Sequence, residues 1–300
     1  MNLARTLLAG WMVTALLSAT PLYAEPPDHY QELRQKYLQA AERGDVEAQN
    51  NLGLMYYEGQ GGARDVGAAE KWFRLAADKG NLTAQQNLGL MYAQGDGSSL
   101  HLRQADYWLR KAAEHGLVKS QHALAALYKK GQGVPQDFQE AAKWYRKAAD
   151  QGDSDAQNNL AMMYAQGQGM PRSLEEALHW YRRAADTGNP VAMNNLGLHY
   201  KKGAGVTQDY QEAERWFRQS AEQGYANAQF NLGMMFRYGQ GVAQESIQGH
   251  MWLNLAAAQG DENAARERDE LMKIMTPAEI SRAQELARTW KPKTRNATGF

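Results

Sequence analysis

Glycine and tryptophan recur along this chain at intervals of 36 positions. Each column keeps its step over the whole length that it covers: Gly44, Gly80, Gly116, Gly152, Gly188, Gly224 and Gly260, and Trp72, Trp108, Trp144, Trp180, Trp216 and Trp252. Two columns that stay in step indicate a tandem repeat. Six units fill residues 44–259 without an insertion or deletion. Because a single unit cannot bury its own apolar face, the chain is expected to fold as a stack of such units.

Each unit has the pattern of two helices. In the first copy the apolar residues of the first helix recur at helical spacing, and those of the second helix follow a short Gly-x-Gly loop: Ala48, Leu52, Met55 and Tyr56, then Ala69, Trp72, Phe73 and Ala76. Asp45 is the expected N-cap of the first helix, and Gly59 its expected end. The small residues Gly53, Gly89, Gly197 and Gly233 recur inside the first helices, which predicts close helix contact there.

The two ends of the repeat array predict capping segments. Residues 30–43 have the pattern of one further second helix, which makes them an N-terminal capping half-repeat. Residues 260–290 predict C-terminal capping helices, the last of which begins with Thr276 as N-cap and Pro277 at its first position. Residues 291–300 are predicted to be a disordered tail.

The first 24 residues have the composition of a secretory signal peptide, with a basic start, an uncharged apolar stretch and a small residue at Ala24. We expect cleavage after Ala24. The alternative, an uncleaved anchor, requires a longer apolar stretch than the roughly 14 residues present, because a membrane span takes about 20. No later segment has the length of a membrane span. The mature protein is therefore expected to be exported, to the periplasm rather than the medium, although secretion stays open.

Composition excludes several classes of function. Lys+Arg and Asp+Glu both number 33, so no overall positive charge draws the chain to nucleic acid. Cysteine is absent, which excludes disulfides, thiolate metal sites and a cysteine nucleophile. The seven histidines occupy unrelated columns without metal-ligand spacing, and the Gly-x-Gly loops recur in every unit, which makes them turns rather than phosphate loops. We therefore predict no metal, no cofactor and no enzymatic activity.

The repeated unit resembles the Sel-one-like repeat (SLR) family, a branch of the tetratricopeptide superfamily. The resemblance lies in the segments Ala48–Gly61 and Ala69–Gly80 and their copies, with a longer Gly-x-Gly loop than the tetratricopeptide unit has. It implies an all-α fold: a right-handed α/α solenoid of tandem 36-residue helix-turn-helix repeats with terminal capping helices. It also implies an adaptor role, in bacterial exported members within protein complexes, envelope signalling or contact with host proteins. Relatives linked to penicillin binding or β-lactam hydrolysis carry cysteines that this chain lacks.

The first helices of such a solenoid line its concave groove, and tetratricopeptide groove positions placed on this register select candidate partner-binding residues. They are Asn50, Leu54, Tyr57, His122, Lys129, Lys130, Asn158, Met162, Asn194, Leu198, Lys201, Lys202, Phe230, Met234, Arg237 and Tyr238. Leu54, Met162, Leu198 and Met234 belong to an apolar row that either forms the floor of the groove or packs between adjacent helices. Asn50, Asn158 and Asn194 belong to a row able to bond a peptide backbone, whereas the next row, from Asn51 to Asn231, is interpreted as bonding between units.

Five of the charged groove residues are cations, and these bear on the choice of partner. Lys129, Lys130, Lys201, Lys202 and Arg237 either stabilise helix C-termini or attract an acidic or C-terminal carboxylate segment. The predicted function is an exported, non-enzymatic adaptor for a protein or extended peptide. The alternatives are a cell-envelope hydrolase acting on cell-wall or β-lactam substrates and a secreted host-interaction factor. The sequence leaves the oligomeric state open.

Overall fold

The fold is an all-α solenoid of consecutive helix pairs. The computed structural model describes residues 27–95 and 99–293, and every regular element within these ranges is a helix. The chain divides into two compact units, Met1–Gln151 and Gly152–Phe300. The predicted signal peptide and residues 294–300 lie outside the described residues.

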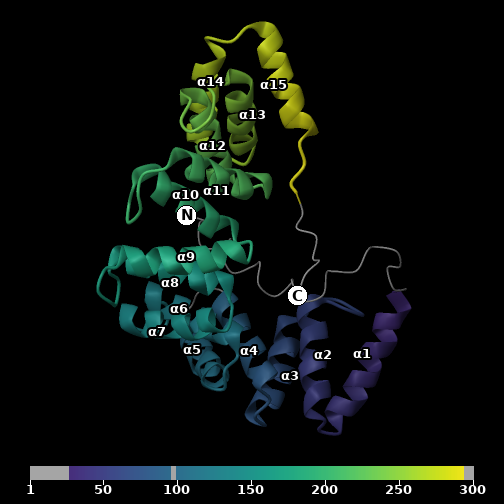
Figure 1. Ribbon diagram of the computed structural model, residues 1–300. Coiled ribbons are helices and arrows are strands. Elements are labelled where there is room, and N and C mark those ends of the chain that lie inside the picture. Colours follow the sequence, from purple (N-terminus) through teal and green to yellow (C-terminus); the bar gives the residue numbers. More distant parts are fainter. Residues whose placement is uncertain (1–26, 96–98, 294–300) are drawn as a thin grey trace. The chain divides into compact units, whose positions relative to one another are not determined.

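The first unit begins with a single helix, which three helix pairs follow (Figure 1). The helices are α1 (Pro27–Glu42), α2 (Val46–Glu58) and α3 (Val66–Asp78), α4 (Leu82–Gln94) and α5 (Ser99–Glu114), and α6 (Val118–Lys130) and α7 (Phe138–Asp150). Each helix packs against the next one along the chain, and the first helices α2, α4 and α6 also contact one another in order.

The second unit has three helix pairs, which two further helices follow. The helices are α8 (Ser154–Gln166) and α9 (Leu174–Asp186), α10 (Pro190–Lys202) and α11 (Tyr210–Glu222), α12 (Ala226–Tyr238) and α13 (Ser246–Ala258), and then α14 (Glu262–Met272) and α15 (Pro277–Thr289). Both α14 and α15 pack on α13.

The helix ends are where the capping residues of the sequence predict them. The Asp45 side chain accepts a hydrogen bond from the backbone N–H of Ala48 at 2.8 Å, and α2 ends at Gly59, whose φ of 76° is left-handed. Thr276 and Glu279 bond reciprocally, which gives α15 a complete capping box. These bonds satisfy N–H groups that have no partner within the helix.

The second glycine of the Gly-x-Gly loop permits a close backbone approach. Gly133 has a φ of 75°, and a Cβ atom there would lie 2.5 Å from the backbone carbon of Leu102 in α5. Both the conformation and the contact exclude a side chain. The loop of one repeat can therefore rest directly on the second helix of the repeat before it.

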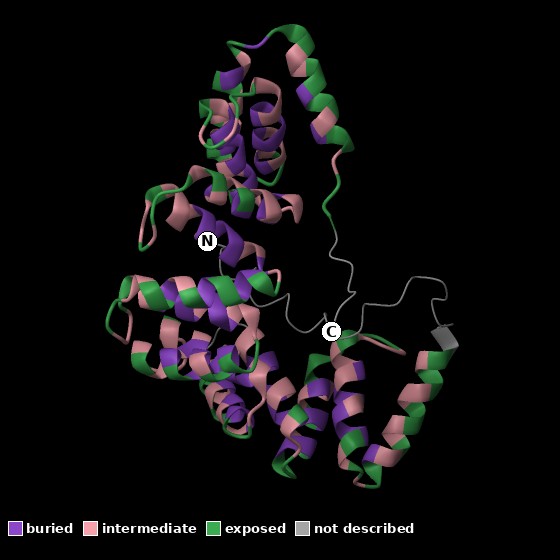
Figure 2. Cartoon of the chain, in the orientation of Figure 1, coloured by how far each residue is buried: buried purple, intermediate pink, exposed green. Residues whose placement is uncertain are grey.

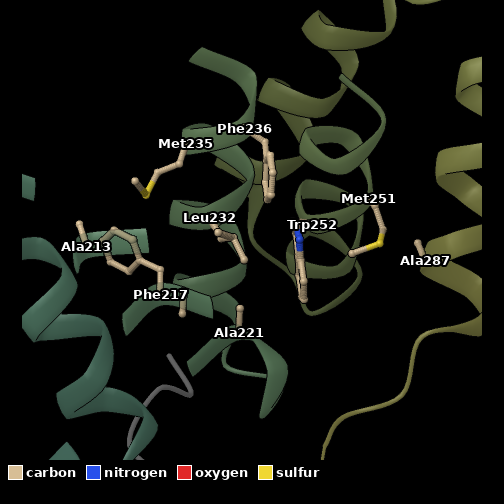
Figure 3. Close-up of a cluster of buried hydrophobic side chains, with 10 residues drawn as sticks. Ala213, Phe217, Ala221, Leu232, Met235, Phe236, Met251, Trp252 and Ala287 are labelled. Carbon is tan, nitrogen blue, oxygen red and sulfur yellow. The ribbon is translucent and has the colours of Figure 1, made fainter. Parts of the chain in front are cut away.

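The recurring tryptophans and small residues form the core. Every Trp of the 36-residue column is at most 8% exposed, and the buried residues form continuous faces on the helices (Figure 2). In the last pairs of the second unit, Trp252 lies near Leu232, Phe236 and Met251 (Figure 3). Gly53 lies against the Phe73 ring so closely that a Cβ atom would come within 2.7 Å of it, which confirms the close helix contact predicted there.

Helices outside the six pairs cover both ends of the array. In α1, Ala41 is buried with Leu52 and Trp72, and Tyr37 packs against them. At the other end, Ala287 of α15 joins the core around Trp252, and the Trp290 ring lies 6.0 Å from the Trp252 ring. Residues 291–293, assigned by sequence to the tail, follow this contact.

The chain remains attached to the second unit as far as Lys293. The Lys293 backbone N–H donates to the Glu222 carbonyl at 2.8 Å, and its ammonium pairs with the Glu222 carboxylate. This segment of the expected tail therefore contacts the C-terminal end of α11.

Truncating a central tryptophan should remove much of the stability. Trp144 is 3% exposed, and Trp144→Ala is expected to lower the free energy of unfolding by about 3–5 kcal/mol because it leaves a large cavity. Urea unfolding followed by circular dichroism measures the change. Ile274, which is 74% exposed, offers the control Ile274→Ala, for which we expect less than about 0.5 kcal/mol. Equal midpoints for Trp144→Ala and wild type would show that the column is not core.

A buried histidine should make the second unit sensitive to acid. His250 in α13 is fully buried, and neither ring nitrogen has a hydrogen-bond partner among the described residues. Burial lowers the pKa of His250, Arg268 lowers it further, and Asp269 opposes the shift. Because the unfolded chain then binds a proton that the folded chain does not, stability is complete above pH ~6.5 and falls as the pH drops below that value.

The substitution His250→Leu should reduce the loss of urea midpoint between pH 7.5 and pH 5.5. The control is His115→Leu, because His115 is exposed. A pH dependence in His250→Leu identical to that of wild type would contradict this role for the imidazole.

Candidate functional site

The candidate site is the exposed side of the first helices, here called the first-helix face. In the first unit it belongs to α2, α4 and α6, and in the second to α8, α10 and α12. It is defined by the sixteen candidate residues of the sequence, of which Asn50, Leu54, Tyr57, His122, Lys129 and Lys130 lie in the first unit and the other ten in the second. Each unit therefore has its own section of this face.

The asparagine row assigned to backbone binding is buried. Asn50, Asn158 and Asn194 are each at most 6% exposed. Asn87 donates to the side-chain oxygen of Asn50 at 3.0 Å, and Asn195 and Asn231 bond in the same way to Asn158 and Asn194. The bonding between repeats expected of the second asparagine row is therefore confirmed for Asn87, Asn195 and Asn231, whereas Asn159 donates to the Asp155 carbonyl of its own helix. Asn50, Asn158 and Asn194 belong to the contact between adjacent first helices, which leaves other positions to meet a partner.

The apolar row is accessible in part. Leu54, Met162, Leu198 and Met234 are half-buried, whereas Leu90 in the same column is 5% exposed. Leu198 packs against the core around Trp252, and Met234 packs beside Leu253. These side chains therefore contact the core and retain an exposed portion, and their role as the floor of a groove stays a prediction.

Two lysine pairs end first helices, one pair in each unit. Lys130 and Lys202 are exposed, and Lys129 and Lys201 are half-buried. Burial lowers the pKa of Lys129 and of Lys201, and the adjacent Lys130 and Lys202 lower them further. The placement of both pairs on one bound segment stays a prediction.

The carbonyl groups at these helix ends already have side-chain donors. Gln136 donates to the backbone oxygen of Lys129 at 2.9 Å, and Gln208 donates to that of Lys201 at 2.9 Å. The same bond, seven residues back, recurs from Arg64 to Tyr57. The ammonium groups are therefore not needed as hydrogen-bond caps for these carbonyls.

Two aromatic candidates have partners within the first unit. The Tyr57 hydroxyl donates to the Gln94 side chain of α4 at 2.9 Å, and the Arg64 guanidinium lies 4.9 Å from the Tyr57 ring centre. The His122 ring meets the Tyr145 ring edge to face at 5.4 Å. Both side chains are half-buried, so they shape the face and expose only a part of themselves to it.

One of the predicted groove cations, Arg237, forms an ion pair with the C-terminal cap. Arg237 pairs with the Glu267 carboxylate of α14 and donates to the Glu267 carbonyl at 2.9 Å. Phe230 packs against Leu253, whereas Tyr238 is 55% exposed. Arg237 is thus held by the cap, and Tyr238 is the accessible member of this end of the face.

A second polar column connects the second helices α3 and α5 to the first helices that follow them, α4 and α6. Arg74 of α3 donates to both Glu70 and the Tyr92 hydroxyl of α4, and Tyr92 donates to Glu70 at 2.6 Å. The same arrangement occurs one repeat later, among Asp106, Arg110 and Tyr128. Arginine recurs every 36 residues from Arg74 to Arg218, which is the signal that sequence reasoning could have used.

The electrostatics of this column follow from its bonds. Burial and the Glu70 carboxylate raise the pKa of Tyr92 to about 12. Burial by itself disfavours the carboxylate form, but the Tyr92 and Arg74 hydrogen bonds lower the pKa of Glu70 overall. The carboxylate is therefore ionised at neutral pH, between a cation and a hydroxyl donor.

The described residues contain no group of three His, Asp or Glu side chains that could hold a metal ion. Within residues 27–95 and 99–293, no helix is both long and apolar enough to cross a membrane. The arrangement offers recognition by shape, apolar contact and charge.

Comparisons with known proteins agree with this geometry. The family model of the Sel1 repeat matches six consecutive segments, residues 46–81, 82–117, 118–153, 154–189, 190–225 and 226–261. The chain belongs to the Sel1 repeat family. A crystal structure of a Sel1 repeat protein from Oxalobacter formigenes is 34% identical, covers 81% of this chain and 70% of its own, and has a TM-score of 0.72. The fold of this Sel1 repeat protein is thus that of a protein-interaction scaffold.

Two further solved structures are similar to the present chain over most of its length. One is c5321, a protective antigen of uropathogenic Escherichia coli with an SLR fold, at 27% identity, 87% and 79% coverage and a TM-score of 0.46. The other is the immunity protein PA5088 of Pseudomonas aeruginosa, at 24% identity, 72% and 84% coverage and a TM-score of 0.45. A search of curated proteins gave no match.

Proposed function

We propose that this Sel1 repeat protein is an exported adaptor that binds a protein segment along its first-helix face and carries out no reaction itself. The observation that carries the proposal is the combination of accessible apolar surface and charge on that face. Half-buried Leu54, Met162, Leu198 and Met234 supply apolar contact, and lysine pairs stand at the ends of α6 and α10. A partner with apolar side chains and acidic groups complements such a surface.

The lysines support partner choice more than they support folding. The carbonyl groups beside them are bonded by Gln136 and Gln208, so capping does not require the ammonium groups. Among the described residues, Lys130, Lys201 and Lys202 form no ion pair. Surface cations without an internal counter-charge, whether exposed like Lys130 and Lys202 or half-buried like Lys201, attract an acidic segment over a distance set by salt, about 8–10 Å at physiological ionic strength.

Export is part of the proposal and rests on the first 24 residues. Their basic start, apolar stretch and Ala24 favour cleavage before Glu25. N-terminal sequencing of protein from a periplasmic extract should give Glu25 as the first residue. An intact Met1 in the mature protein would contradict export by this route.

Partner capture tests the function directly. The mature chain, immobilised and exposed to periplasmic extract, should retain a protein that mass spectrometry identifies. The variant with Lys129, Lys130, Lys201 and Lys202 changed to Gln should bind that protein more weakly and with a smaller salt dependence, at nearly unchanged stability. Titration of the purified partner at two salt concentrations measures both effects.

A matched variant separates the first-helix face from overall charge. The control changes to Gln four exposed lysines that lie outside the first helices of the six pairs: Lys71, Lys79, Lys147 and Lys273. It removes the same number of positive charges. This control should bind like wild type. Equal affinity and salt dependence in wild type and the first quadruple variant would overturn the electrostatic part of the proposal.

A further inference from the structure

One repeat of the second unit has two of the three groups of the arginine column and lacks the third. In α9, Arg182 donates to the Tyr200 hydroxyl of α10, as Arg74 does to Tyr92. The column position that holds Glu70 in the first repeat, Asp106 in the second and Glu214 in the fifth is Ala142 in the third repeat and Leu178 here. The two donors are therefore placed as in the first two repeats, without the acid that they bond there.

Within the described residues, the donors of this repeat have no carboxylate. Arg182 forms no ion pair there, and its guanidinium is exposed. The Tyr200 hydroxyl accepts from Arg182 and donates to no group of the described chain, whereas the Tyr92 hydroxyl donates to Glu70 at 2.6 Å. The missing acceptor thus leaves both an arginine and a hydroxyl hydrogen facing solvent.

The acid one turn further along α9 does not take this place. Asp186 follows Arg182 by four residues, as Asp78 follows Arg74 and Glu222 follows Arg218. In those two repeats the arginine nevertheless pairs with the acid that precedes it, at 3.0 Å for Arg74 and Glu70. The preceding position is therefore the one from which a carboxylate reaches the guanidinium.

The other repeats show the geometry that an incoming carboxylate would adopt. One Glu70 oxygen lies 3.0 Å from an Arg74 guanidinium nitrogen and 2.6 Å from the Tyr92 hydroxyl, and one Asp106 oxygen lies 3.2 and 3.4 Å from the equivalent atoms. Both the four-atom Asp and the longer Glu side chain satisfy the pair. Charge-assisted bonds of this kind are among the stronger ones in proteins.

We propose that Arg182 and Tyr200 bind the carboxylate of an aspartate or glutamate side chain of a partner protein, in the place that Glu70 and Asp106 occupy in their own repeats. The proposal rests on the adaptor function and names one point of contact for it. Tyr200 directly precedes Lys201 and Lys202 in α10, so the carboxylate site lies at the same helix end as that lysine pair. An acidic residue of the bound segment would meet a built donor pair there rather than only diffuse positive charge.

A peptide titration tests the site without a known partner. The probes are acetyl-Ala-Ala-Glu-Ala-Ala-amide, its Gln counterpart, and the Gln peptide with a free C-terminus. The readout is the side-chain Nε–H signal of Arg182 in the full ¹⁵N-labelled chain. The Glu peptide should shift this signal saturably and the Gln amide should not. Equal shifts with both amidated peptides would overturn the site, and a larger shift with the free C-terminus would replace the side-chain occupant by a chain end.

Substitutions at position 178 provide matched variants. Leu178→Glu installs the missing acid, which should bond Arg182 as Glu70 bonds Arg74, and should abolish the peptide-induced shift. Leu178→Gln adds a polar group of similar size without charge and should keep the shift. Persistent binding in Leu178→Glu would contradict the proposal. Circular dichroism establishes that both variants fold.

Two more variants keep the test decisive if position 178 does not tolerate a charge. Arg182→Gln changes an exposed residue and should lower the affinity for the Glu peptide by about tenfold or more, measured on the Tyr200 ring signals. Glu70→Leu should open an equivalent site at Arg74 and Tyr92, seen as a second saturable shift at Arg74. Unchanged affinity in Arg182→Gln would remove the assignment.

The partner experiment distinguishes this site from the adaptor function. If a captured partner binds Leu178→Glu as tightly as wild type but loses affinity for the four-lysine variant, the carboxylate site fails and the adaptor function stands. If the Glu peptide titrates Arg182 as expected while no protein is retained from the extract, the site stands and the adaptor function fails.

Discussion

A buried amide hydrogen bond sets the register between successive repeats. Gln49 of α2 donates to the Ala41 carbonyl of α1 at 3.0 Å, across the turn that leads into the first helix of a repeat. The bond recurs over the same eight residues at Gln85, Gln121 and Gln229. The Ala41 carbonyl also accepts from the Gly44 backbone N–H at 3.0 Å, so a slip of one residue at this turn would cost the buried Gln49 amide its partner rather than the carbonyl. The bond supports the register where the glutamine is present; the fifth repeat has Met193 in this column and keeps the 36-residue period without it.

Fixed register gives each column one environment, which is why differences within a column carry information. Glu70, Asp106 and Glu214 hold one column position and pair with an arginine one turn later. Leu178 stands in the same position beside Arg182 with no acid to offer. In a fold without repeats, no equivalent position would show that this leucine stands where an acid is expected. Here the first two repeats, with Glu70 and Asp106, define both the missing group and the donors that it leaves.

Much of the architecture could be predicted because its causes are local. Caps such as Asp45, ends such as Gly59 and the spacing of Trp72 depend on residues within one or two turns. The roles of polar columns could not be predicted in this way, because they depend on contacts 18 to 37 residues apart. Asn194 appears in sequence as a groove residue, but it is buried by Asn231 of the next repeat, and Tyr92 appears as an apolar core residue although its hydroxyl bonds an acid and an arginine. Arg237 is held by Glu267, a residue outside the repeats that no column predicts.

The distribution of counter-charges connects a neutral chain to a charged face. On the second helices α3, α5 and α11 an arginine is matched within one turn, as Arg74 is by Glu70 and Arg218 by Glu214, so these charges stabilise the stack and cancel at short range. At the last repeat Arg237 is matched by the cap. The lysine pair of α10 and Arg182 have no such match among the described residues, although equal numbers of acids and bases exist in the chain. Selectivity for an acidic partner can therefore arise at interior repeats without net charge, because the balancing acids are used elsewhere in internal pairs and caps.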